Sequence, residues 1–343
     1  MASTTKPKGF YSAGFWTEYL STQRTKLPDL ADVSNVSPCV VRFLGGNPGD
    51  MQLQGTNTYL IGTGNSRILV DTGEGFPQWA VNVTRYLEDH DISISHVLLT
   101  HWHADHTGGV ADLLAHDPSI SVHKQKPGKD QEPIANGQRF ETQGATLRAI
   151  WTPGHTADHT CFLLEEDNAL FTGDNVLGHG YSVAECLDEY TKSLRLMASL
   201  GCAIGYPGHG DVIRNLPRKM VTYIAQRDSR EKQVYAALLE EASSESNRSI
   251  GSSSRSGSSY SGSDYGSGDD EEGDEMGTAK GLSTTDISLR LYGDVSKDPV
   301  TFESALKPLL NQVLFMLADH GRVSSKLVGP DKTRHWFVKG STY

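Results

Sequence analysis

Seven side chains of the types that bind metal ions define the chemistry that this sequence can support. They are His101, His103, Asp105, His106, His155, Asp174 and His209. The first four fall inside the segment Thr100–Gly109, which reads Thr-His-Trp-His-Ala-Asp-His-Thr-Gly-Gly. Imidazole nitrogens combined with carboxylates suit zinc better than magnesium or calcium, which prefer oxygen ligands alone. The set therefore predicts a zinc site, in preference to a polar loop with scattered histidines.

The spacing within this segment indicates where each side chain can point. In an extended chain, residues two apart point to the same side, so His101, His103 and Asp105 can converge. His106 then points elsewhere and can reach a second metal ion. Glycines at 108–109 permit a tight turn, and the apolar positions over 110–114 predict a helix after it. We expect the indole of Trp102, between two ligands, to pack beneath the site.

Each ligand-bearing segment follows an apolar run that is typical of a short buried strand. The runs are Val97–Leu99, Ala149–Trp151, Ala169–Phe171 and Ala203–Tyr206. The last three lead into glycine-containing turns that carry His155, Asp174 and His209. Because sites at strand ends are the expected layout of open α/β sheets, the sequence predicts an α/β fold with its ligands at one edge.

The remaining patterns divide the chain into four regions. Residues 1–38 form an N-terminal arm, and its aromatic residues either pack on the main domain or line part of a substrate cleft: Phe10, Tyr11, Phe15, Trp16 and Tyr19. Residues 39–242 form the catalytic domain, with further strands over 40–44, 58–61 and 67–70 and helices over 77–90, 185–200 and 217–242. Residues 281–343 form a C-terminal region with helices over 284–292 and 302–320 and a short strand over 336–338.

Between the last two regions, residues 243–280 are rich in Ser, Gly, Asp and Glu. Such a segment cannot bury enough apolar surface to offset the entropy of ordering, so we expect it to be disordered. It is either a tolerated insertion or a phosphorylated regulatory loop.

Composition limits the classes of partner. The 343 residues carry a formal net charge of −11, which argues against nucleic acid as a substrate because binding it requires neutralising phosphates. No apolar run is long enough to span a membrane, and the N-terminus lacks the pattern of a secretory signal. The four cysteines, Cys39, Cys161, Cys186 and Cys202, show no pairing pattern, so we expect a cytoplasmic protein.

The motifs over roughly residues 40–240 resemble those of the metallo-β-lactamase superfamily. The resemblance implies a four-layer αββα sandwich with two zinc ions per chain at one edge. It further implies that one zinc is held by His101, His103 and His155, the other by Asp105, His106 and His209, and that Asp174 bridges the two.

The resemblance also bears on residues beside the ligands. Bound zinc supplies a nucleophile by lowering the pKa of water. Asp105 is expected to be both a ligand and the catalytic residue that accepts the proton of this nucleophile. Asp71 matches an early Asp of the superfamily that supports ligand imidazoles, and an Asx-turn cap on a strand is the open alternative. We expect His123, His159 and His179 to lie at the surface or beside the ligands, without being ligands.

A closer resemblance, to one subgroup of the superfamily, limits the possible substrates. The segments Asn47–Gly49 and Leu53–Leu60 are similar to those of a subgroup whose members end in a winged-helix-like appendage. It contains animal β-lactamase-like protein 2, which is similar to an endoribonuclease, and the fungal atrochrysone carboxyl acyl-carrier-protein thioesterases. Glu185–Leu194 and the aromatic arm resemble the fungal enzymes more closely.

This resemblance implies a zinc-dependent thioesterase of aromatic polyketide biosynthesis. Its partner would be the acyl carrier protein domain of a non-reducing polyketide synthase, from which it would release atrochrysone carboxylic acid or a similar product. Two other activities stay open at this stage: cleavage of single-stranded RNA and glyoxalase-like hydrolysis of a small thioester.

Overall fold

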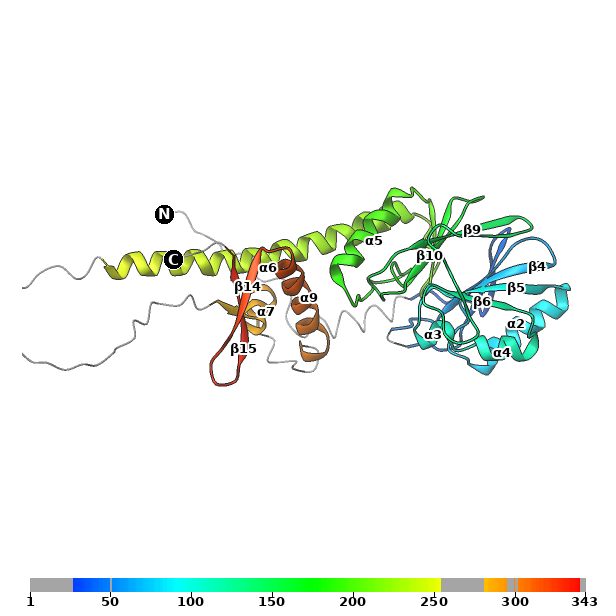
Figure 1. Ribbon diagram of the computed structural model, residues 1–343, viewed down its shortest axis with the longest axis horizontal. Coiled ribbons are helices and arrows are strands. Elements are labelled where there is room, and N and C mark those ends of the chain that lie inside the picture. Colours follow the sequence, from blue (N-terminus) through cyan, green and yellow to red (C-terminus); the bar gives the residue numbers. More distant parts are fainter. Residues whose placement is uncertain (1–26, 50, 254–280, 295–298, 300–301, 340–343) are drawn as a thin grey trace, which may run out of the picture. The chain divides into compact units, whose positions relative to one another are not determined.

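The computed structural model describes residues 27–49, 51–253, 281–294, 299 and 302–339 (Figure 1). The five aromatic residues of the expected N-terminal arm lie outside this part of the chain, as do residues 254–280 of the Ser/Gly/acidic segment. The described residues form two compact units, which divide between Arg227 and Asp228. The sequence placed the corresponding boundary at residue 242.

Two β-sheets form the centre of the first unit. The larger has seven strands in sequential order: β1 (Val33–Ser37), β2 (Val40–Leu44), β3 (Asn57–Ile61), β4 (Ser66–Val70), β5 (Ser93–Leu98), β6 (Ser121–Lys124) and β7 (Glu132–Pro133). The smaller has the order β12 (Ile204–Pro207), β11 (Ala169–Gly173), β10 (Thr160–Leu164), β9 (Ala145–Trp151) and β8 (Arg139–Thr142). Strand β1 lies within the expected arm and pairs antiparallel with β2, so the end of that arm belongs to the sheet.

The two sheets face each other across an apolar core that includes Tyr59 and Leu98 from the larger sheet and Leu147, Phe162 and Tyr206 from the smaller. This arrangement explains why β2, β3, β10 and β11 are buried along their whole length. Most residues of these strands are apolar because the outer faces are covered as well.

Helices cover the outer faces. Helix α2 (Pro77–His90) and helix α4 (Val110–His116) pack on the larger sheet, where Trp79, Val83 and Leu113 join a second apolar core. Helix α5 (Leu187–Ser199) packs on the smaller sheet, and the Sγ atom of Cys161 on β10 lies 3.9 Å from the Sδ atom of Met197. The expected αββα order of layers is therefore present.

Helix α6 (Leu216–Ser253) begins in the first unit and continues into the second. The prediction ended this helix at residue 242 and treated the rest as disordered, which is wrong for 243–253 because these residues are helical. Nucleation is the costly step in forming a helix, so a helix that is already formed extends through Ser, Glu and Asn at a cost of less than about 1 kcal/mol per residue.

The second unit contains helices and a small sheet. They are β13 (Leu282–Ser283), α7 (Thr284–Tyr292), a π-helical turn (Phe302–Leu306), α9 (Lys307–Asp319), β14 (Val323–Val328) and β15 (Thr333–Val338), with the strand order β13-β15-β14. Ser283 and Asp286 form a reciprocal cap at the start of α7. The expected strand over 336–338 is longer and has a hairpin partner in β14, whose polar residues gave no strand signal. The likeness to a winged helix stays a prediction.

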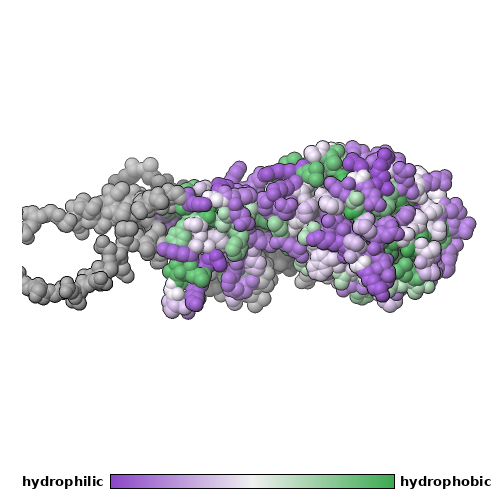
Figure 2. Space-filling model, viewed as in Figure 1, coloured by the Kyte–Doolittle hydropathy of each residue, from purple (hydrophilic) through white to green (hydrophobic). Residues whose placement is uncertain are grey.

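Among the described helices, none combines the length and the apolar character that crossing a membrane requires. On the face drawn in Figure 2, hydrophilic residues predominate and apolar residues occur among them in small areas.

Candidate metal centre

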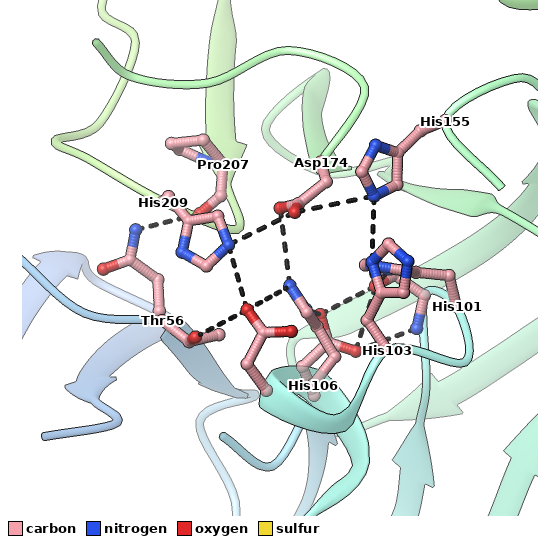
Figure 3. Close-up of polar contacts among 12 residues, drawn as sticks. Thr56, His101, His103, His106, His155, Asp174, Pro207 and His209 are labelled. Atoms are coloured by element: carbon pink, nitrogen blue, oxygen red, sulfur yellow. Dashed lines mark hydrogen bonds and ion pairs between the residues drawn. The ribbon is translucent and has the colours of Figure 1, made fainter. Parts of the chain in front are cut away.

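All seven predicted site residues lie together, at the edge of the sandwich where the ligand-bearing strands end. His101 and His103 follow β5, and Asp105 and His106 lie on a short helix, α3 (Ala104–Thr107). The other three follow β9, β11 and β12 in turns: His155, Asp174 and His209. Figure 3 shows the side chains of the five histidines and Asp174 pointing toward one another from these separate segments.

Three imidazoles form the first cluster, which we call the histidine group: His101, His103 and His155. The Nδ1 atom of His103 lies 2.9 Å from Nε2 of His101 and 3.2 Å from Nε2 of His155. Three nitrogen atoms at these distances can share one cation.

The second cluster, the carboxylate group, consists of Asp105, His106 and His209. The Oδ2 atom of Asp105 lies 3.6 Å from Nε2 of His106 and 3.3 Å from Nε2 of His209. The extended-chain argument placed Asp105 with His101 and His103, and that placement is wrong. The chain turns into α3 at Ala104, and about 100° of rotation per residue directs Asp105 away from those histidines.

Asp174 lies between the two groups (Figure 3). Its Oδ1 atom is 3.4 Å from Nε2 of His106, and its Oδ2 atom is 3.2 Å from Nε2 of His209 and 3.7 Å from Nε2 of His155. A single carboxylate therefore reaches histidines of both groups, as a bridging ligand must.

Hydrogen bonds on the far side of the rings fix which nitrogen of each histidine is free. The Nδ1–H of His155 donates to the carbonyl oxygen of Val183 at 2.9 Å. The Nδ1–H of His101 donates to Oγ1 of Thr100, also at 2.9 Å, and this hydroxyl in turn donates to Asp71 at 2.8 Å. Both rings consequently direct an unprotonated Nε2 atom into the cluster.

Asp71 supports both groups. Its Oδ2 atom accepts the Nδ1–H of His106 at 2.7 Å, and its Oδ1 atom accepts the backbone N–H of Thr100 at 2.8 Å. Asp71 adopts a left-handed backbone conformation with φ of 60°. Of the two interpretations of Asp71 that the sequence left open, the supporting role agrees with these contacts, because the carboxylate orients ligand-type imidazoles.

The donor atoms fit a metal ion. The Nε2 atom of His106 is buried and has no hydrogen-bond partner within the described part of the chain. In the histidine group, Nδ1 of His103 can donate its proton to only one of the bare Nε2 atoms of His101 and His155, whereas a shared cation would satisfy all three nitrogens. Nitrogen and carboxylate ligands in these numbers match the preference of zinc.

Comparison with known proteins decides the family. The model of the metallo-beta-lactamase superfamily matches residues 52–133 and 122–209. Thioesterase pkgB of Emericella nidulans is 64% identical over 315 residues, which cover 92% of this chain and 93% of that protein. The chain belongs to the metallo-β-lactamase superfamily.

Other members of this superfamily match almost the whole chain. Lactamase-like protein nscB of Arthroderma benhamiae is 49% identical over 330 residues, covering 96% of this chain and 69% of that protein. The crystal structure of a beta-lactamase domain protein from Burkholderia ambifaria covers 91% of this chain and 97% of its own, with a TM-score of 0.64. At 18% identity, the latter likeness supports the fold alone.

The charges in this metallo-β-lactamase site differ between the two groups. Burial lowers the pKa values of His101 and His103, and repulsion from neighbouring histidines adds to the effect. Burial opposes protonation of His209 too, but Asp174 and Asp105 outweigh it and raise its pKa to about 9. For Asp105, burial opposes ionisation, but the hydrogen bond from His209 and the charge of His106 lower the pKa to about 2.

Contacts between the sheets hold the turn that carries His209. From β3, Nδ2 of Asn57 donates to the carbonyl oxygens of Pro207 and Gly210 at 2.9 and 2.7 Å. Position 208 must be glycine for Asp174 to keep its place, since a Cβ atom there would lie 2.3 Å from Oδ1 of Asp174. Sequence reasoning missed both residues, although the Pro-Gly-His-Gly turn carried a signal for a glycine with a packing role.

The expectation for Trp102 is wrong. Its side chain is 53% exposed, although its ring centroid lies 4.5 Å from that of His103. Successive residues of an extended segment alternate in direction, and the side of the loop opposite the ligands faces solvent here.

The other histidines have varied positions. His159 is buried beside the ligands, 5.4 Å from His101 between ring centroids, in agreement with one of the two expectations. His123 is buried away from the ligands, with its Nε2 atom 3.0 Å from Nδ1 of His96, which neither expectation described. His179 is partly exposed.

Proposed function

We propose that this chain is a metal-dependent thioesterase that releases an aromatic polyketide from an acyl carrier protein. The observation that carries the proposal is the 64% identity, over 92% of the chain, to a protein named thioesterase pkgB. Superfamily membership alone would leave the substrate open, because one fold supports many reactions.

The site is proposed to hold two Zn²⁺ ions. The histidine group would hold one ion, the carboxylate group would hold the other, and Asp174 would contact both. When bound, zinc supplies a Lewis acid that polarises a carbonyl oxygen and lets water act as a nucleophile at neutral pH.

Asp105 is proposed as the residue that moves the proton. Its side chain is 15% exposed, against 10% for Asp174 and 2% for Asp71, so it is the most accessible of these three carboxylates. The hydroxyl of Thr56 holds its Oδ2 atom at 3.3 Å. As water adds to the thioester carbonyl carbon, the Asp105 carboxylate accepts a proton and passes it to the sulfur when the carbon–sulfur bond breaks, which yields a carboxylic acid and a thiol.

The surroundings of the histidine group suit an apolar acyl chain. Trp102, in contact with His103, is 53% exposed, and Val183, whose carbonyl oxygen holds His155, is 57% exposed. Large apolar side chains left in water beside a reaction centre can bind an aromatic group. We therefore propose a fused-ring polyketide thioester, attached to the carrier domain of a non-reducing polyketide synthase, as the substrate.

We further propose that the enzyme works in the cytoplasm. All four cysteines, Cys39, Cys161, Cys186 and Cys202, are free thiols. Such thiols persist in a reducing compartment.

The test uses wild-type protein and Asp105→Asn with measured zinc content. Both are given a carrier-bound aromatic polyketide and an N-acetylcysteamine thioester of an aromatic acid. We expect release of the free acid by wild type and a loss of at least about 100-fold in the variant, the lower end of proton-transfer contributions. Zinc-loaded protein that releases no acid but degrades unstructured RNA would refute the thioesterase proposal and favour a nuclease.

A further inference from the structure

His159 lies directly behind the bridging carboxylate and is fully enclosed, with 1% of its surface exposed. Its Nε2 atom is 3.1 Å from the backbone nitrogen of Asp174, and its Nδ1 atom is 2.9 Å from Oγ1 of Thr152. None of the roles derived so far uses this histidine.

The hydrogen bonds around His159 have a fixed direction. The backbone N–H of Asp174 can only donate, so Nε2 of His159 must be the unprotonated nitrogen. The proton is then on Nδ1 and is donated to the hydroxyl of Thr152. That hydroxyl donates onward to the sulfur of Cys161 at 3.2 Å. One order of donors and acceptors satisfies the whole chain of contacts.

The backbone of the turn is shaped around the same contact. Gly173 has φ of +48°, and a Cβ atom at this position would lie 2.5 Å from Nε2 of His159. On the other side, the backbone N–H of Gly208 donates to the carbonyl oxygen of Gly173 at 2.8 Å. The peptide before Asp174 is therefore held between Gly208, which follows β12, and the His159 ring.

Asp174 needs this support more than the other proposed ligands do. Its carboxylate must reach His106, His155 and His209, at 3.4, 3.7 and 3.2 Å, so a small rotation of its backbone would disturb both groups at once. Among the hydrogen bonds and ion pairs of the described residues, the carboxylate of Asp174 contacts histidines alone, and its Oδ1 atom accepts no hydrogen bond. Its position must be set through the main chain.

We propose that His159 is a positioning residue that sets the bridging carboxylate of Asp174 by accepting its backbone N–H. The inference rests on the proposed metal-binding function of the site. His159 is not a further ligand, because the nitrogen that faces the site is already occupied by the Asp174 N–H. Its role requires an acceptor at the Nε2 position and not merely a ring that fills space.

Two amide substitutions separate these possibilities. In His159→Gln, the side-chain oxygen can occupy the position of Nε2, whereas in His159→Asn the shorter side chain places its polar atoms near the position of Nδ1. The affinity for zinc is measured by competition with a chelator, starting from metal-free protein. Supporting contacts of ligand residues typically contribute 10–100-fold to metal affinity, so we expect a loss of about that size in His159→Asn and His159→Ala, and a smaller loss in His159→Gln.

Leu170→Ala is the matched control for general loss of packing. Leu170 is fully buried on β11, the strand that leads to Asp174, and lies outside the chain of hydrogen bonds. It should lower the thermal unfolding temperature and leave the zinc affinity unchanged. Equal affinities for Asn and Gln variants, or a loss in Leu170→Ala as large as in His159→Asn, would overturn the inference.

Nitrogen NMR of the His159 ring gives an independent readout. We expect Nε2 to have the chemical shift of an unprotonated nitrogen both without and with zinc, because its partner is a backbone N–H and not the metal. A protonated Nε2, or a shift of Nε2 to that of a metal-bound nitrogen on zinc addition, would refute the proposed contact. Wild-type protein that binds no zinc would instead refute the metal assignment itself, so the two failures are distinguishable.

Discussion

The histidine group and the carboxylate group lie at the same edge of the sandwich, yet different kinds of atom orient them. In the histidine group, the partners of His101 and His155 are neutral oxygens, the hydroxyl of Thr100 and the carbonyl of Val183. In the carboxylate group, His106 is held by the carboxylate of Asp71, and His209 faces Asp105 and Asp174.

The difference affects how ready each group is for a metal ion. Burial keeps the pKa values of His101 and His103 low, so their metal-free rings are neutral at pH 7. Burial acts on His106 and His209 too, but neighbouring carboxylates outweigh it and raise their pKa values. We infer that His101 and His103 are preorganised as neutral ligands, whereas the carboxylate group must release protons before it binds a metal ion.

The largest effect should come from removing what the groups share. Asp174→Ala takes away the carboxylate that reaches both groups and leaves His106 and His209 without one neighbouring charge. We expect both zinc ions to be lost. The affinity for zinc should fall by more than the roughly 10–100-fold that supporting residues contribute. Elemental analysis after dialysis measures this. Asp89→Ala, an exposed carboxylate control on α2, should retain two ions.

A change in pH should separate the two groups. The pKa of His209 is raised to about 9 in the metal-free protein, so a proton occupies the ring at pH 7 and must leave when zinc binds. Because the pKa of His106 is raised as well, affinity at the carboxylate group should rise with pH by at least about tenfold per unit up to about pH 9, and fall as pH decreases. Affinity at the histidine group should change little over pH 7–9. Calorimetric titration in buffers of different ionisation enthalpy counts the protons; equal release at both groups would contradict the comparison.

Substitutions behind the ligands should act on one group or on both. Asp71→Ala removes the partner of His106 and, through Thr100, of His101, so both groups should lose affinity by about 10–100-fold. Thr100→Val leaves the His106 contact intact and should weaken the histidine group alone. Chelator competition that gives a separate zinc-binding constant for each group distinguishes the two variants. If Asp71→Ala weakened the carboxylate group alone and Thr100→Val weakened neither group, the contact of Thr100 with His101 would have no influence on zinc binding.

The smallest effect should come from Ser182→Ala. The Ser182 hydroxyl lies 3.3 Å from Nδ1 of His155, which already donates to the backbone carbonyl of Val183 at 2.9 Å. Because no side-chain substitution removes that carbonyl, zinc affinity should fall by no more than the worth of one weak hydrogen bond, about 0.5 kcal/mol or roughly twofold. A tenfold loss would mean that the hydroxyl, and not the carbonyl, orients His155.

Sequence patterns anticipated that the seven predicted site residues lie together, because two simple signals coincided. Apolar runs such as Ala169–Phe171 predicted buried strands, and a turn with a metal-binding residue followed each, so the convergence at one edge could be anticipated. The direction of Asp105 could not, since a single helical turn of four residues is too short to produce a periodic pattern.

Other features had no signal in the types of the residues. The carbonyl oxygen of Val183 orients His155, but every residue has a carbonyl oxygen. The continuation of α6 to Ser253 was hidden by polar composition, because local propensity favours a loop where an existing helix favours one more turn. The exposure of Trp102 depends on which side of its loop other segments cover.

The left-handed backbone at Asp71 has a consequence for reading relatives of this protein. Asparagine adopts such a conformation as easily as aspartate, and its side-chain oxygen could still accept the N–H of Thr100. Its amide group, however, would donate to Nδ1 of His106 and so transfer that ring's proton to Nε2, the atom that faces the metal. A homologue with Asn at this position would keep the fold and all seven candidate ligands, yet we expect it to bind zinc more weakly because of one residue outside the ligand set.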